Sequence, residues 1–154
     1  MPAGAVARVP PLVVHGFRNA SGEELRYLNF HAPGVGFADY LRAMRDGRAM
    51  TYDQEPPPAD GVRPATEAVI GEPGTRVHVD IDAIRIEELR REPGDHAPQP
   101  HDRLQSYYVL DGELELRAGD RETVAATGTW VQVPPGVPHA LGFPGAVRYL
   151  DVRA

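Results

Sequence analysis

Apolar and polar residues alternate along several short segments of the C-terminal two thirds of the chain. The alternation is clearest in residues 75–89 (TRVHVDIDAIRIEEL), and it recurs in residues 105–119, 128–136 and 146–152. A period of two is typical of β-strands that bury one face. The pattern therefore predicts an antiparallel all-β unit, arranged as a sandwich or barrel.

Residues 105–119 (QSYYVLDGELELRAG) have the sequence of a β-hairpin. Asp111-Gly112 is a favoured two-residue turn between two alternating runs. Leu114 and Leu116 are predicted to face one side of the second strand, and the charged residues between them the other.

The N-terminal third shows a different pattern. Residues 23–31 alternate as a strand would, whereas residues 36–46 place apolar side chains at helical spacing before Gly47. Residues 51–65 contain three consecutive prolines and few apolar side chains, which predicts an extended linker. We therefore expect an arm of strands and one helix over residues 1–50, and a barrel over residues 66–154.

Composition narrows the function classes. The 154 residues include no cysteine, which excludes disulfides and cysteine-based zinc sites. The net charge of −6, with no basic cluster, argues against nucleic acid and anionic membrane surfaces as partners. Prolines interrupt the first apolar stretch and no apolar run is long enough to span a bilayer, so we expect a cytoplasmic protein.

A short segment of the chain occurs twice. Shifted by 124 positions, residues 4–15 meet residues 128–139, and six positions are identical, including the one that pairs His15 with His139. Nothing before residue 4 matches the segment that precedes the second copy. The sequence thus predicts one whole unit and the back half of another.

The repeated segment resembles the second motif of the cupin superfamily, G-x5-P-x-G-x2-H-x3-N. Gly128, Pro134, Gly136 and His139 match it, and Phe143 replaces the final Asn. The first cupin motif, G-x5-H-x-H-x3,4-E-x6-G, is degenerate. If it ends at Gly112, its positions fall as follows: Gln99 in place of the first His, His101 as the second His, and Gln105 in place of the Glu.

The resemblance implies a cupin barrel of the double-stranded β-helix, or jelly-roll, type. With the half-repeat, it also implies a bicupin that lacks the front half of its first barrel. In the family, the motif residues converge on one metal, here implying His101, His139, Gln99 and Gln105 as ligands for a divalent Fe, Mn, Ni, Cu or Zn ion. Gln99, His101 and Gln105 share strand parity, so all three are predicted to face inward.

Two alternatives to this ligand set remain open. In the first alternative, the imidazoles of His101 and His139 are hydrogen-bonded to the side chains of Gln99 and Gln105 without a metal. Alternatively, a bulge near Pro98 and Pro100 would let His96 join His101 and His139 in a three-imidazole site. His15, in the half-copy, has no motif-one partners and is predicted to be a surface or interface residue.

Tyr107, Trp130 and Arg103 are the predicted pocket residues. The leading functional prediction is a cupin that binds a small molecule in its barrel, with a metal as a further option. The alternatives are a metal-dependent enzyme (a dioxygenase, isomerase or cyclase) and a purely structural domain. Sheet edges and the N-terminal arm further predict a homodimer.

Overall fold

A computed structural model describes residues 1–9, 13, 15, 18–32, 34, 36–50, 69–71 and 76–154. The chain divides into two compact units: Val6–Gly71 is one, and Glu72–Ala154 together with Met1–Ala5 is the other. The predicted linker, residues 51–65, lies outside the described residues. Within the described part of the chain, no helix has the length and apolar character needed to cross a membrane.

The N-terminal unit contains one helix, α1 (Phe37–Arg45), which confirms the helix predicted over residues 36–46. It also contains a small antiparallel ribbon, in which β1 (Val6–Arg8) pairs with β2 (Val69–Gly71). The strand predicted over residues 23–31 is wrong, since this segment has no regular structure. Leu25 and Tyr27 are both more than half exposed. Alternation alone forms no strand where no neighbouring strand supplies hydrogen bonds.

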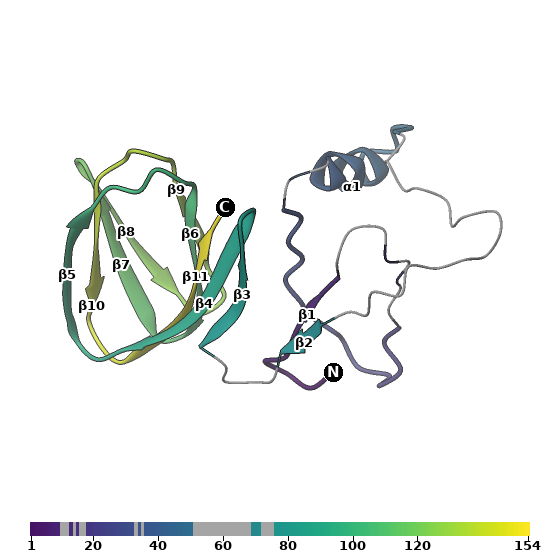
Figure 1. The fold of residues 1–154 in the computed structure, drawn as a ribbon, viewed down its shortest axis with the longest axis horizontal. Helices are drawn as coiled ribbons and strands as arrows, with labels where there is room; N and C mark the ends of the chain where they lie inside the picture. The colour runs from purple at the N-terminus through teal and green to yellow at the C-terminus, as the bar shows by residue number, and fades with distance from the viewer. Residues whose placement is uncertain are drawn as a thin grey trace. The chain divides into compact units, whose positions relative to one another are not determined.

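The C-terminal unit is an antiparallel barrel of two sheets (Figure 1). The five-stranded sheet has the order β3-β4-β11-β6-β9, and the four-stranded sheet has the order β5-β10-β7-β8. Their bounds are β3 (Val77–Ile81), β4 (Ile84–Arg91), β5 (Gly94–Gln99), β6 (Gln105–Asp111), β7 (Glu113–Ala118), β8 (Arg121–Ala126), β9 (Trp130–Val133), β10 (His139–Phe143) and β11 (Val147–Arg153). The all-β prediction is confirmed.

The predicted hairpin at Asp111-Gly112 is wrong, although both of its strands exist. β6 pairs with β11 and β9, whereas β7 pairs with β10 and β8, so the chain passes from one sheet to the other at Gly112. Gly112 has a φ of 82°, and a Cβ there would lie 2.5 Å from the Ala146 carbonyl oxygen. A left-handed glycine suits this crossing as well as it suits a tight turn.

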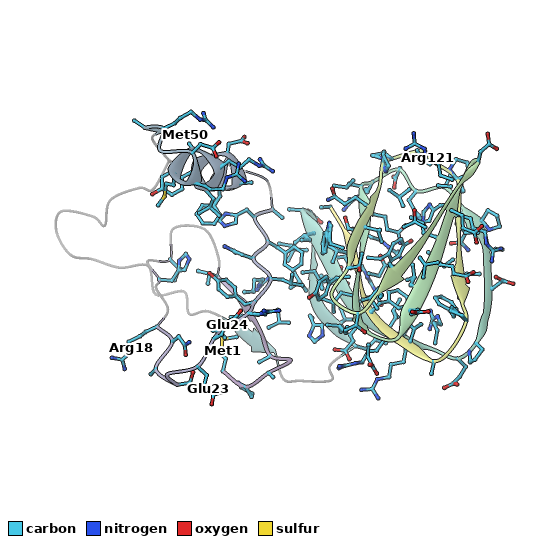
Figure 2. The ribbon with its side chains drawn as sticks, turned by 180° about the vertical axis from the view of Figure 1, so that it is seen from behind. Met1, Arg18, Glu23, Glu24, Met50 and Arg121 are labelled. Carbon is cyan, nitrogen blue, oxygen red and sulfur yellow. The ribbon has the colours of Figure 1, made fainter. Side chains whose placement is uncertain are left out.

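Inward-facing side chains from both sheets form one apolar core (Figure 2). Leu114 and Leu116 are buried in it as predicted, and Val109, Phe143 and Tyr149 join them. This core fills the barrel at the level of the middle of the strands. Polar side chains replace apolar ones at the start of β6 and at the end of β11. These polar side chains form the candidate site.

Candidate functional site

Two segments far apart in sequence bring His101 and His139 together. The turn that precedes β10 contains Gly136, whose left-handed φ of 74° directs its N–H to the His101 carbonyl oxygen, 2.6 Å away. The two imidazole centroids consequently lie 5.5 Å apart. This part of the predicted ligand set is therefore assembled in the structure.

His139 is buried, and both of its ring nitrogens have hydrogen-bond partners. Nε2 lies 2.7 Å from the Tyr107 hydroxyl, and Nδ1 lies 3.1 Å from the Val137 carbonyl oxygen. Burial, with a further contribution from the charge of Asp151, raises the pKa of Tyr107, so its hydroxyl keeps its proton. Tyr107 therefore donates to Nε2, and the His139 proton lies on Nδ1, from which it is donated to Val137.

His101 is only partly buried and lies at the wall of a pocket. Burial lowers the pKa of His101 below its usual 6.5, and the positive charge of Arg153 acts in the same direction. The His101 imidazole is consequently neutral at pH 7. A neutral imidazole offers one hydrogen-bond donor and one acceptor.

Gln105 faces the barrel interior, as predicted, but it contacts neither histidine through a hydrogen bond recorded among the described residues. Its Nε2 donates to Oδ1 of Asp151, at 2.9 Å, while its Oε1 is buried without a partner in the described part of the chain. The second oxygen of Asp151 accepts from Arg153, at 2.7 Å. Gln105, Asp151 and Arg153 thus form a connected polar chain.

The sequence analysis missed Asp151 and Arg153. Both lie on β11, on the same face as the buried Tyr149, and Asp151 lies opposite Tyr107 across the β6–β11 pairing. The alternation over residues 146–152 could have placed Asp151 on the inner face. The available signal was that Asp151, a charged residue, occupies a position where the alternation predicts a core side chain.

A second polar pair lies on β4, beside this chain. Glu87, opposite Asp151, accepts from Arg85 Nε at 3.2 Å. The hydrogen bond from Arg85 lowers the pKa of Glu87 below its usual range, against the opposing effect of burial. Glu87 is therefore ionised at neutral pH.

A pocket of about 400 Å³ opens at this end of the five-stranded sheet. Its walls combine carboxylates, guanidiniums and one imidazole: Asp80, Ile81, Asp82, Arg85, His101, Asp102, Arg103 and Arg153. Arg103, one of the predicted pocket residues, closes the rim by donating to the Asp82 carbonyl oxygen at 2.8 Å. Trp130 lies elsewhere, because its indole packs against Tyr108, on the sheet face opposite Tyr107.

The two remaining candidates, His96 and Gln99, lie on the edge strand β5. Gln99 is opposite His139, and His96 is opposite Leu141, with a bulge between the two pairs as the alternative ligand set required. Both side chains are nevertheless exposed. The His96 ring packs edge-on against Phe143, at a centroid distance of 5.9 Å.

These residues do not fit a metal ion in the arrangement observed. Among the described residues, no three His, Asp or Glu side chains converge as ligands. His139 Nε2 is occupied by the Tyr107 hydroxyl, and both oxygens of Asp151 have donors. A metal ion bound by His101, His139, Gln99 and Gln105 therefore stays a prediction.

The described residues of the N-terminal half-copy repeat two features of their counterparts. Gly4 and Gly128, 124 positions apart, have φ values of 82° and 85°. His15 Nδ1 lies 2.8 Å from the Val13 carbonyl oxygen, which repeats the contact of His139 with Val137. His15 is exposed, as predicted for a histidine without motif-one partners.

Comparison with solved structures gave partial similarities at low identity. A structure described as ethanolamine utilization protein Q, from Salmonella typhimurium LT2, is 24% identical, with 46% of this chain and 56% of that chain covered and a TM-score of 0.43. A cupin-2 domain containing protein from Shewanella frigidimarina NCIMB 400 is 19% identical, with 50% and 76% covered and a TM-score of 0.47. A cupin-like protein from Thermotoga maritima MSB8 is 20% identical, with 46% and 56% covered and a TM-score of 0.44.

The chain thus spans just over half the length of the Salmonella and Thermotoga proteins. A search of curated proteins found no match. Among protein families, residues 88–153, from β4 to the end of β11, match the model of the Cupin domain. The part of the barrel that this match covers, with its strands from two antiparallel sheets closed around a common core and His139 placed after the Pro134–Gly136 turn, is a cupin domain.

Proposed function

We propose that this cupin domain binds a small polar molecule at the mouth of its barrel. The observation that carries the proposal is the pocket of about 400 Å³ whose wall includes His101 and Arg153. Its volume falls in the range of small-molecule sites. Arg153 also belongs to the buried polar chain with Asp151 and Gln105, so the pocket wall is continuous with polar groups inside the barrel.

The chemistry of the pocket walls suggests what such a molecule would carry. Guanidinium groups offer only hydrogen-bond donors, carboxylates only acceptors, and the neutral His101 one of each. The lining contains three guanidiniums and three carboxylates, so no single sign of charge dominates it. A ligand with both donors and acceptors, and little net charge, complements these walls best.

The wall is held in place by backbone hydrogen bonds, which favours a preformed site. Leu104 and Ala154 exchange two such bonds, at 3.1 and 3.0 Å, and Gly136 fixes the carbonyl of His101. These bonds tie the segment carrying His101 and Arg103 to the end of β11 and to the turn before β10. Preorganised walls reduce the entropy lost on binding.

The proposal is tested by screening a library of small polar fragments with protein-observed NMR on the ¹⁵N-labelled chain. Fragments are expected to bind the parent and to shift backbone amides near residues 80–82, 101–103 and 153. The variant His101→Trp fills the pocket and is expected to lose them. Arg121→Gln, at the turn into β8 at one end of the barrel (Figure 2), removes an exposed arginine outside the pocket and should retain them.

Two results would contradict the proposal. The first is a parent protein that binds no fragment of the library. The second is a set of fragments that binds His101→Trp as well as it binds the parent, because such fragments occupy some other surface.

A further inference from the structure

A positive charge that belongs to the protein itself lies at the mouth of the barrel, because the Arg153 side chain is 38% exposed. Arg153 donates to Asp151 at 2.7 Å, and the Asp151 side chain is only 5% exposed. A guanidinium keeps its charge at every physiological pH. This ion pair lies on β11, next to Tyr107, whose hydroxyl reaches His139.

Each oxygen of the Asp151 carboxylate already has a hydrogen-bond donor. Oδ1 accepts from Gln105 and Oδ2 accepts from Arg153. A buried carboxylate is costly unless both a countercharge and hydrogen bonds are supplied, and here the protein supplies both. The need for a cation at this point is thus already met.

The histidines are placed in the same electrostatic environment. His101 and Arg153 line one pocket, and the His101 ring lies beside the His139 ring in a tilted arrangement. A divalent ion between the two imidazoles would lie close to the guanidinium. Like charges in a partly desolvated site repel more strongly than they do in water.

We propose that the guanidinium of Arg153 takes the place of a metal cation in this barrel. It neutralises the buried Asp151 and keeps divalent cations away from His101 and His139. The site consequently works without a metal, although it retains two of the imidazoles that imply one. Removing the guanidinium should leave the Asp151 carboxylate free for a cation and end the repulsion of a divalent ion at His101 and His139, whose imidazoles Ni²⁺ and Zn²⁺ accept as ligands.

The test is to titrate Ni²⁺ into the full chain by calorimetry, without a His-tag. Arg153→Met is expected to bind Ni²⁺ at least about tenfold more tightly than the parent, a change comparable to that caused by gaining one supporting ligand. Arg153→Lys keeps the positive charge and should bind as weakly as the parent. Adding His139→Ala to Arg153→Met should abolish the gain.

Arg148→Met is the matched control, since Arg148 lies on the same strand but on its outer face, where it contacts Glu88. It should leave Ni²⁺ affinity unchanged. Breaking a buried ion pair is strongly destabilising, so a second variant keeps a hydrogen-bond donor for Asp151. Arg153→Gln removes the charge but keeps such a donor, and it should still bind Ni²⁺ more tightly than the parent.

A parent that binds Ni²⁺ tightly, and loses it on His139→Ala, would overturn the inference. So would a folded Arg153→Met, or a folded Arg153→Gln, with no gain in affinity. The fragment screen on the parent involves no metal, so this inference and the proposed ligand binding can fail independently of one another.

Discussion

At the scale of the residue, the amide at position 105 is explained by the side chain it faces. Gln105 donates to the carboxylate of Asp151, and a glutamate at this position would instead set two carboxylates against each other inside the barrel. The family pattern expects an acid at position 105. In this chain Asp151 on β11 supplies the acid instead. A neutral amide at position 105 can donate a hydrogen bond to it.

Gln105→Glu is therefore expected to destabilise the protein at pH 7, by about 1–3 kcal/mol, since a buried polar group loses its partner and meets a like charge. Adding Asp151→Asn should restore much of the loss, because an amide again faces a carboxylate. Chemical denaturation of the parent, both single variants and the double variant measures the coupling. An additive double variant would show that the two side chains do not interact.

The titration of His101 provides a second test at this scale. Its pKa is expected below the usual 6.5, mainly because of burial and next because of the charge of Arg153. Since the folded pKa is lowered, the native state loses stability as the pH falls below about 6.5, where the unfolded chain takes up the proton first. NMR titration should show the pKa rising in Arg153→Met. No movement would place Arg153 too far from His101 to act on it.

At the scale of the element, alternation predicted which side chains share a face of a strand, but it did not predict which strands pair with one another. Leu114 and Leu116 are buried as expected, since a period of two fixes which side chains share a face. The partner strand is not encoded in that period. Asp111-Gly112 satisfies a tight turn and an inter-sheet crossing equally, so the sequence predicted the strands correctly and their pairing wrongly.

Gly112→Ala is expected to destabilise the barrel more than Gly119→Ala does. Both glycines have positive φ, which costs alanine about 1 kcal/mol. Only at Gly112 would the added Cβ meet a backbone oxygen, so a further loss of about 1–3 kcal/mol is expected there. Thermal unfolding of the two variants separates the clash from the backbone strain. Equal losses would mean that the backbone near Ala146 moves aside.

At the scale of the whole molecule, the candidate site could be predicted in part. The second motif located His139 and its turn, and parity placed Gln105 and Tyr107 inside. Asp151 and Arg153 were missed because no motif includes them and because burial of an ion pair depends on contacts between strands distant in sequence. The exposure of Gln99 likewise follows from the edge position of β5, which local pattern does not reveal.

Assembly is a prediction at this scale. The terminal strands of both sheets, β3 and β9 in one and β5 and β8 in the other, leave edges that another strand can pair with. We expect a homodimer, and light scattering should give twice the 16.8 kDa of the chain over a wide range of concentrations. A mass of one chain throughout that range would reject it.

The histidine contact that occurs in both copies of the repeat has a practical consequence for chemical labelling. His15 and His139 share one local geometry, in which Nδ1 contacts the carbonyl two residues earlier, yet His15 is exposed while His139 is buried and its Nε2 is occupied. An acylating reagent specific for histidine should therefore modify His15 rapidly and spare His139 until the barrel opens. The chain thus carries an internal reference, and the ratio of the two labelling rates reports directly how often the interior of the barrel becomes accessible to solvent.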